Sequence, residues 1–212
     1  MRIAVFGATG LAGRAIVTEA LARDHAVTAL SRRADAAASS ERLTVHALDV
    51  AEESTLDPVL ADADAAVLTI RLAPGEEHRL APLSRGFLDA AARSRTRVLV
   101  VGGSAPLRSP DDPARLVLHD PRRVPEAWQA VAQASLDQFR VCQAHAYAGW
   151  TYLSPPAVLA PGARSGAYRR GGDTLLTDAR GDSHITAPDL AIAVLDELEN
   201  PGDARHFTVA QA

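Results

Sequence analysis

The residues with the clearest chemical meaning in this chain are three glycines at intervals of three, the first of which ends an apolar run at the start of the sequence. This spacing lets the chain turn sharply at the first glycine, lets a pyrophosphate approach the backbone at the second, and lets a helix pack closely on a strand at the third. The free N–H groups at the start of that helix favour an anion. Because a β-rich run precedes the glycines and apolar residues at helical spacing follow them, we predict a dinucleotide site rather than a plain strand-to-helix turn. The predicted cofactor contacts in this segment are Gly7, Thr9, Gly10, Leu11, Ala12 and Gly13.

The choice between NAD(H) and NADP(H) is made at the end of the second predicted strand, where an NAD-binding chain usually has an acid that holds the ribose 2′-hydroxyl. This chain has Ser31, Arg32 and Arg33 at that place. A guanidinium group can hold a 2′-phosphate through two parallel hydrogen bonds, so we predict NADP(H), with NAD(H) still possible. The alternative is a solvated basic turn. Asp35 stands too far along the chain to replace the missing acid.

Further cofactor contacts are expected where later strands end, because the ligand crevice of an open parallel sheet lies outside the carboxyl ends of its strands. Asp49 and Val50 follow the third predicted strand and could flank the adenine, although an Asp in this position often only closes a turn or caps a helix. The other predicted contacts are Thr69, Ile70, Arg71, Gly102, Gly103, Pro155 and Pro156.

Three side chains are candidates for the substrate side of the crevice. Ser104 follows the fifth predicted strand, where a nicotinamide or substrate oxygen should lie, and its alternative is a simple turn serine. His119 stands in the following loop and could reach the mouth of the crevice as a catalytic group, although a loop histidine is commonly solvated. Tyr168 could stack on a flat substrate or be an ordinary packing residue.

The elements that must position these residues alternate between strand and helix. Strands are predicted before Gly7 and over Ala26–Leu30, Leu43–Leu48, Ala65–Ile70 and Arg97–Val101, with helices after the glycines, over Leu56–Leu60 and from about Glu77 to Arg93. The fourth strand is continuously apolar, which fits a parallel sheet covered on both faces. The order of elements predicts an α/β fold with a doubly wound, mostly parallel sheet.

The second half of the chain is less regular. The proline-rich segment Gly102–Val124 is predicted to be a long loop, and Gly162–Gly181, rich in glycine and arginine, is predicted to form a hairpin over the ligand crevice. The remaining predicted elements are a helix after Pro125 with Trp128, Val131, Phe139 and Cys142 near one face, a strand at Tyr152 and Leu153, a helix over Pro188–Leu198 and a strand over His206–Ala210. We predict one domain over residues 1–212, with the part from about residue 150 contributing the substrate side.

The composition limits the class of protein. A chain of 212 residues with 47% hydrophobic residues can bury a sizeable core. The net charge of −4 argues against a general surface for nucleic acid or anionic membranes, and no apolar run is long enough to predict a membrane span or a signal peptide. Cys142 is the only cysteine and is expected in the core, so we predict no disulfide, no metal site and a cytoplasmic location, with a homodimer possible. All 22 Lys and Arg residues are arginines, which excludes any mechanism that needs a lysine.

Several segments resemble a known family. They are Val100–Gly103, Trp150–Pro156, Pro161–Gly162, Ser183–Ile185, Asp196–Pro201 and Phe207–Val209. The glycine motif, GATGxxG, resembles that of the extended and atypical short-chain dehydrogenases/reductases. Together these segments are similar to the bacterial NADH–flavin reductase family, which is close to NmrA-like proteins and biliverdin reductase B. The resemblance covers essentially the whole chain.

This resemblance implies a Rossmann-type fold, binding of NAD(P)(H), and reduction of a flavin or a related acceptor. It places the family's glycine motif on the three glycines described above and its proline pair, where the nicotinamide amide is expected, on Pro155 and Pro156. Ser104 would match the active-site serine of biliverdin reductase B. The histidine that follows the proline pair in that enzyme is replaced here by Ala157, which is a departure from its pattern.

The chain therefore resembles an NADPH-dependent reductase that uses a flavin or quinone-like acceptor as a substrate. Classical members of the superfamily protonate a carbonyl with Tyr-x-x-x-Lys, but four positions after Tyr147, Tyr152 and Tyr168 stand Thr151, Pro156 and Gly172. A conjugated ring spreads the charge of a transferred hydride and can take its proton from water, so it needs no such pair. The alternatives are an NmrA-like redox sensor that binds dinucleotide without turnover, and an epimerase or dehydratase on the same fold.

Overall fold

An eight-stranded sheet forms the centre of the computed structural model, which describes residues 1–33 and 39–212. The strand order is β10-β12-β8-β5-β4-β1-β2-β3, and neighbouring strands are parallel except for β10 and β12, which are antiparallel. The strands are β1 (Arg2–Phe6), β2 (Ala26–Ser31), β3 (Leu43–Ala47), β4 (Ala65–Leu68), β5 (Arg97–Val101), β8 (Trp150–Ser154), β10 (Tyr168–Gly171) and β12 (His206–Gln211). The predicted α/β fold with a mostly parallel sheet in a single domain is confirmed.

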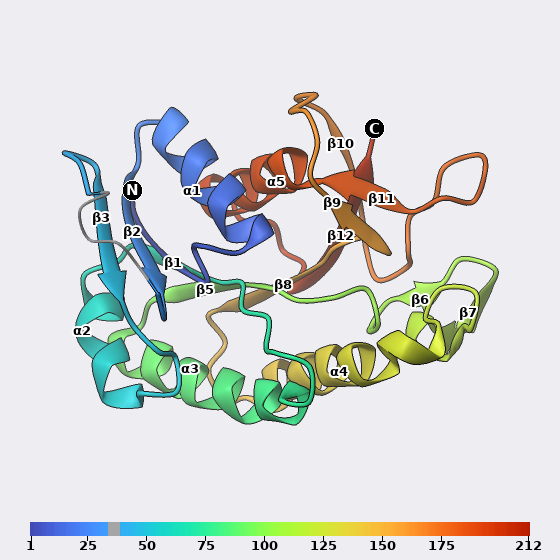
Figure 1. The fold of residues 1–212 in the computed structure, drawn as a ribbon, viewed down its shortest axis with the longest axis horizontal. Helices are drawn as coiled ribbons and strands as arrows, with labels where there is room; N and C mark the ends of the chain where they lie inside the picture. Colours follow the sequence, from blue (N-terminus) through green and yellow to red (C-terminus); the bar gives the residue numbers. More distant parts are fainter. Residues whose placement is uncertain (34–38) are drawn as a thin grey trace.

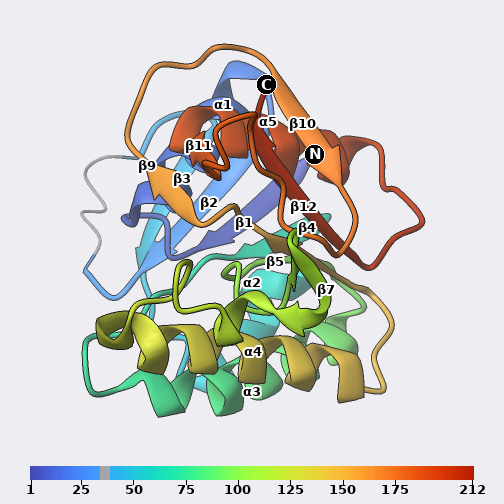
Figure 2. The ribbon, with the colours of Figure 1, turned by 90° about the vertical axis from the view of Figure 1, so that its right-hand side faces the viewer.

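Helices cover both faces of this sheet (Figure 1). On one face, α1 (Leu11–Ala22) packs against α5 (Ala187–Glu199). On the other face, α3 (Leu80–Ser94) contacts both α2 (Leu56–Ala61) and α4 (Gln129–Ala144). Figure 2 shows the sheet between these two helical layers. The sheet is therefore doubly wound, as the alternation of strand and helix predicted.

Strand β4 shows why its sequence is apolar at every position. Its four residues are fully buried, and their side chains alternate between the two layers. Ala65 and Val67 belong to the core beneath α1 and α5, whereas Ala66 and Leu68 belong to the core above α2, α3 and α4. A strand covered on both faces has no position at which a polar side chain could reach water.

The chain winds away from β1 in two directions. Strands β2 and β3 lie on one side of β1, and β4, β5 and β8 lie on the other. Where the winding reverses, between β1 and β4, the connections leave the sheet on opposite faces, so a crevice opens at the carboxyl ends of these two strands. The glycine turn after β1 and the residues after β4 are therefore brought to the same place.

The elements predicted in the first half are confirmed, with small shifts at their ends. Strand β4 stops at Leu68 rather than Ile70, and the next two residues turn out into the crevice. The helix predicted from Glu77 begins as the 3₁₀ turn η3 (Glu77–Arg79) before α3, and the 3₁₀ turn η2 (Glu53–Thr55) precedes α2.

The segment Gly102–Val124 is not entirely a loop, so that prediction is partly wrong. Strands β6 (Arg108–Ser109) and β7 (Asp112–Leu116) form a small antiparallel hairpin, and the 3₁₀ turn η4 (Val117–His119) follows it. The strands are short, and β7 contains a proline and polar residues without apolar alternation, so the sequence carries no strand signal.

The prediction of a hairpin over Gly162–Gly181 is wrong. The segment has one strand, β10, which pairs with β12 so that Tyr168 stands opposite Gln211. Nearby, β9 (Val158–Ala160) pairs in parallel with β11 (His184–Thr186). Each strand pairs with a segment remote in sequence, which local glycine and arginine composition does not reveal.

Asp189, at the start of α5, fixes this C-terminal region in place. Its fully buried carboxylate accepts hydrogen bonds from the backbone N–H groups of Ser165 at 2.9 Å and Gly166 at 3.0 Å, and from Gln211 Nε2 at 2.7 Å. Burial alone would raise the pKa of Asp189, but hydrogen bonds from Gln211, Ser165 and Gly166 outweigh it and lower the pKa. One carboxylate thereby joins the segment before β10, the end of β12 and helix α5.

Candidate active site

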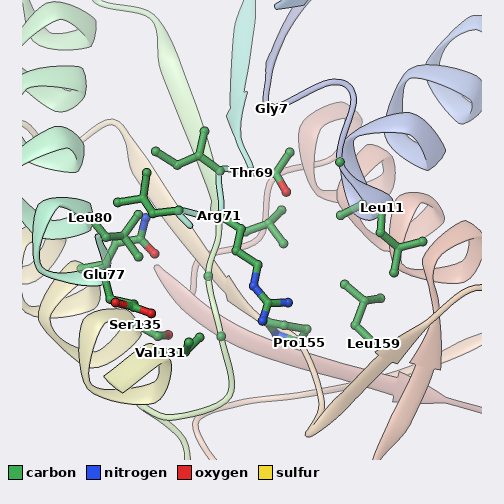
Figure 3. Close-up of a pocket in the computed structure, with 18 of the residues that line it drawn as sticks. Gly7, Leu11, Thr69, Arg71, Glu77, Leu80, Val131, Ser135, Pro155 and Leu159 are labelled. Carbon is green, nitrogen blue, oxygen red and sulfur yellow. The ribbon is translucent and has the colours of Figure 1, made fainter. Parts of the chain in front are cut away.

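A cavity of about 830 Å³ lies at the carboxyl edge of the sheet. Its walls come from the ends of the strands β1, β2, β4, β5 and β8, from the starts of α1, α3 and α4, and from β9 (Figure 3). Of the predicted cofactor contacts, all but Gly13 line it, and so does Ser104. Residues that are far apart in the sequence are thus gathered around one space.

The glycine turn is shaped by close contacts between backbone segments. Gly7 has a φ of 91°, and a Cβ there would lie 2.2 Å from the carbonyl oxygen of Thr69. A Cβ on Gly13 would lie 2.2 Å from the carbonyl oxygen of Gly7. Gly13 therefore acts through helix packing, as its place in the motif predicted, while Gly10 lines the cavity at the start of α1.

The start of α1 is suited to an anion. Its N-cap residue, Gly10, provides no side-chain hydrogen bond, and the first turn contains no acidic residue. The first intrahelical bond runs from the N–H of Arg14 to the carbonyl of Gly10, so the three preceding N–H groups have no partner within the helix. Together with the space that the glycines leave, these N–H groups fit the pyrophosphate of a dinucleotide.

The residues at the end of β2 face the same cavity. Arg32 and Arg33 are exposed, whereas Ser31 is buried and its hydroxyl donates a hydrogen bond of 3.0 Å to the carbonyl of Arg33. This bond shapes the turn that presents the two guanidinium groups. Asp35 lies outside the described residues.

Asp49 and Val50, which we predict to flank the adenine, line the cavity after β3. Asp49 also closes a local turn, because its Oδ1 accepts a hydrogen bond of 3.0 Å from the N–H of Ala51. The two interpretations of this residue are therefore compatible. Val50 is buried in the core shared with α2 and α3.

The floor at the other end of the cavity rests on a buried polar network that the sequence did not predict. A Cβ on Gly102 would lie 1.8 Å from the Tyr152 hydroxyl, so this phenol lies directly against the glycine backbone. The phenol oxygen is 3.1 Å from the carbonyl of Ser135 and 3.2 Å from Gln138 Oε1, and Gln138 Nε2 donates to Ser84 Oγ at 3.0 Å. Burial strongly raises the pKa of Tyr152.

Ser135 and Gln138 are also cavity-lining residues of α4. Their signal in the sequence is that two polar side chains stand three residues apart within a helix that packs on the sheet. Buried polar groups need partners, so such a pair indicates either a buried network or a ligand. Ser104 lies near this end of the cavity, and its carbonyl accepts a hydrogen bond of 3.0 Å from the N–H of Leu107, so it is a turn residue as well.

Two of the predicted substrate-side residues are not brought to the cavity. His119 is exposed at the end of η4, outside the cavity wall. Tyr168 lies on the edge strand β10, packs against the core beneath α5, and donates a hydrogen bond of 2.9 Å to Asp196 Oδ2. Burial, aided by this bond, raises the pKa of Tyr168 to about 12. The geometry gives Tyr168 a packing role.

Other parts of the described chain offer no second chemical centre. Cys142 is fully buried, and burial raises the pKa of its thiol to about 12, which fits the predicted core position. Within residues 1–33 and 39–212, no group of three His, Cys, Asp or Glu side chains could hold a metal ion. Over the same residues, we find no helix with the length and apolar character to cross a bilayer.

Comparison with known families agrees with this geometry. Residues 7–201 match the family model described as NAD(P)H-binding. The chain belongs to this NAD(P)H-binding family. The family is one of the atypical short-chain dehydrogenases/reductases, so the resemblance identified in the sequence is confirmed, and the binding of NAD(P)(H) is a property of the family.

Relatives of this NAD(P)H-binding protein span nearly its full length. The uncharacterized protein YwnB of Bacillus subtilis strain 168 is 36% identical over 203 residues, which are 95% of this chain and 93% of YwnB. A structure from Streptococcus pneumoniae TIGR4, named "putative NADH-flavin reductase", is 28% identical with a TM-score of 0.89 and full coverage of both chains. A structure from Bacteroides thetaiotaomicron, named "putative epimerase", is 29% identical with a TM-score of 0.89 and covers 99% of this chain and 96% of its own. The names agree on no single reaction.

Proposed function

We propose that this protein is an NADPH-dependent reductase that transfers a hydride to a flat conjugated acceptor such as a free flavin or a quinone. The observation that carries the proposal is that the cavity joins the glycine turn to a second end where no phenol is available as an acid. Tyr152 is sealed beneath Gly102, Tyr147 donates to the carbonyl of Thr96 at 2.9 Å, and Tyr168 is outside the cavity. Burial also raises the pKa of Tyr147.

The missing acid bears on the choice of acceptor. When bound, the reduced nicotinamide supplies a hydride. Reduction of a simple carbonyl produces an alkoxide, which needs a proton from a positioned acid. A flavin or quinone spreads the added charge over its ring and takes its proton from water. The balance is then oxidised acceptor, NADPH and one proton giving reduced acceptor and NADP⁺.

The roles of the protein residues follow from this proposal. The N–H groups at the start of α1 would bind the pyrophosphate, and Arg32 and Arg33 would bind the 2′-phosphate. Pro155 and Pro156 would form the wall beside the nicotinamide, and the Ser104 hydroxyl would donate a hydrogen bond to the acceptor or the nicotinamide amide. Binding and orientation supply most of the rate in such a site. A cytoplasmic location, as predicted from the sequence, would supply reduced dinucleotide.

The test is a panel of acceptors with purified protein and NADPH, followed by loss of the absorbance of the reduced cofactor. We expect activity with free flavins or quinones and much weaker activity with simple aldehydes and ketones. The reverse preference would refute the argument from the missing acid.

An epimerase is the second candidate, because the Bacteroides neighbour carries that name. An epimerase or dehydratase would restore its cofactor in each cycle, so it would convert substrate without net consumption of NADPH. A redox sensor would bind NADPH but would not oxidise it with any acceptor of the panel. The panel therefore separates a reductase from both alternatives, because neither alternative consumes NADPH.

A further inference from the structure

The cavity has an aromatic side chain at its rim that the proposed function has not used. Trp128, the last residue of η5 (Glu126–Trp128), is 51% exposed and lines the cavity just before α4 begins. It belongs to a small set of exposed large apolar side chains in the described chain, which are Met1, Leu11, Trp128 and Val158. All of these except Met1 line the cavity. Exposed apolar surface gathered around one opening indicates a ligand with an apolar face.

Trp128 is paired with a cation from across the cavity. The guanidinium carbon of Arg71 lies 5.2 Å from the centroid of the indole ring. Figure 3 shows the Arg71 side chain extending from the segment after β4 into the open space of the cavity, toward Pro155. The contact holds a charged group beside a flat aromatic surface.

The charge at this rim is not neutralised by nearby carboxylates. Among the described residues, neither Arg71 nor Arg123 has a carboxylate within 4.0 Å, whereas the neighbouring Arg122 pairs with Asp120. Arg123 donates one hydrogen bond of 2.8 Å to the carbonyl of Gly181 and also lines the cavity. A guanidinium has five N–H donors, so both arginines keep donors for a ligand.

The acidic residue lining this part of the cavity is Glu77, whose Oε2 accepts a hydrogen bond of 2.8 Å from the N–H of Gly75. The Glu77 carboxylate therefore already stabilises the turn before α3 through this hydrogen bond. The balance of charge at the rim remains positive, and it favours an anion.

We propose that Trp128 and Arg71, with Arg123, form a recognition site for an acceptor that combines a planar ring with an anionic group such as a phosphate. The ring stacks on the indole, and the anion takes hydrogen bonds from the guanidinium groups. The proposal rests on the proposed function, because it places the acceptor in this cavity. It adds that a phosphorylated flavin is preferred to an uncharged one.

The preference is tested by comparing FMN with riboflavin, which share one ring system and differ by the phosphate. Binding is measured by quenching of flavin fluorescence in the absence of any dinucleotide, so the result does not depend on turnover. We expect FMN to bind at least about ten-fold more tightly than riboflavin, as one or two charge-assisted hydrogen bonds require. Equal affinities for the two flavins would overturn the proposal.

Two variants divide the site into its parts. Arg71→Gln should remove most of the preference for FMN and leave riboflavin binding unchanged. Trp128→Ala should weaken both flavins by a similar factor, and Trp128→Phe should restore part of that loss because it keeps a stacking ring. The protein has two tryptophans, and the other, Trp150, is only 5% exposed, so the part of the quenching by FMN that needs contact with the ring should be lost in Trp128→Phe, while energy transfer from Trp150 remains.

Arg140→Gln is the matched control for Arg71→Gln. Arg140 is an exposed arginine on α4, outside the cavity wall, and it pairs with Asp137. An equal loss of FMN preference in this control would mean that general surface charge causes the preference. If Arg71→Gln instead weakens NADPH and leaves FMN unchanged, Arg71 serves the dinucleotide and the proposal is wrong.

The outcomes separate this proposal from the proposed function. If FMN binds with the expected preference but NADPH is not oxidised, the reductase fails and the recognition site stands. If NADPH is oxidised equally well with FMN, riboflavin and uncharged quinones, the reductase stands and the recognition site fails.

Discussion

The two ends of the cavity are built from different parts of the polypeptide. At the end that we propose for the dinucleotide, the shape comes from the backbone, since Gly7 lies against the carbonyl of Thr69 and the free N–H groups belong to the first turn of α1. At the end that we propose for the acceptor, the surface comes from side chains, including Trp128 and Ser135, that different turns and helices bring together. A backbone site fixes one ligand geometry across a family, whereas a side-chain site can change its ligand through a few substitutions. Neighbours that share this fold carry different reaction names, and a fold by itself does not determine the reaction.

The largest expected effect is at the backbone end. Gly7 and Gly75 both have a φ of 91°, but only Gly7 has another atom within 4 Å of an added Cβ. The positive φ costs a non-glycine residue about 1 to 2 kcal/mol, and overpacking adds roughly 1 to 3 kcal/mol. We expect Gly7→Ala to lower the free energy of unfolding by roughly 3 kcal/mol or more and to abolish NADPH binding, while Gly75→Ala loses only the cost of its φ.

Denaturant unfolding of both variants and a fluorescence titration with NADPH provide the measurement. Equal losses of stability in the two variants would contradict the claim that contact with Thr69 requires the glycine. They would leave only the backbone angle as the cause.

The next effect concerns cofactor choice. Arg32→Gln and Arg33→Gln should each weaken NADPH by about ten-fold or more if that guanidinium binds the 2′-phosphate, because one charge-assisted contact is worth roughly 1.5 to 3 kcal/mol. NADH, which lacks the phosphate, should bind unchanged. Arg180→Gln, at an exposed arginine outside the cavity, is the control and should affect neither cofactor. Equal affinities of the unmodified protein for NADPH and NADH would remove the basis of this assignment.

Acid should weaken the packing of α4 against the sheet. His206 Nε2 lies 2.9 Å from Ser154 Oγ, and its ring packs 4.3 Å from the ring of Phe139 on α4. Burial lowers the pKa of His206 to about 4. The unfolded chain binds this proton near pH 6.5 and the folded chain near pH 4. The contribution of His206 to the free energy of unfolding is therefore fully present above pH 6.5 and is lost as the pH drops from 6.5 to 4.

The loss should be about 2 kcal/mol, after allowing for the part of the ring that solvent still reaches. It is measured as the free energy of unfolding at pH 7 and pH 4 in the unmodified protein and in His206→Gln, which cannot titrate. Parallel pH profiles of the two proteins would show that protonation of His206 does not lower the free energy of unfolding, which would contradict the prediction.

The smallest effect on stability is expected at Ser104. Its side chain lines the cavity, and its backbone makes the turn. Ser104→Ala should therefore change the free energy of unfolding by less than about 1 kcal/mol while lowering turnover by roughly three- to ten-fold, the value of one neutral hydrogen bond. An unchanged rate with every active acceptor would leave Ser104 as a turn residue.

The same contrast explains what the sequence could predict. The glycine spacing, the apolar run of β4 and the alternation of strand and helix are local patterns, and each predicts its structure without knowledge of the rest of the chain. The β10 pairing depends on a strand that is about forty residues away in the sequence, so a hairpin was the natural and wrong prediction. Because the hairpin was predicted over the ligand crevice, Tyr168 was predicted beside the substrate, whereas the structure places it outside the cavity.

Helix α4 shows the same limit at the site. Trp128 was expected on the apolar face with Phe139 and Cys142, but it belongs to the turn before the helix and is half exposed. Ser135 and Gln138 are part of no recognisable sequence motif. They form a polar network only because the Tyr152 phenol reaches them from β8. Convergence of side chains from separate elements is a property of the tertiary fold.

The most direct test of the central claim follows the acceptor itself. FMN is mixed with NADPH under anaerobic conditions, with and without a catalytic amount of the protein, and the bleaching of the oxidised flavin is recorded. We predict bleaching far above the rate without protein, faster with NADPH than with NADH at low cofactor concentration. The same measurement is repeated with a quinone in place of FMN. If the acceptor is reduced at the same rate with and without the protein in both cases, the proposal that the protein is a reductase is contradicted.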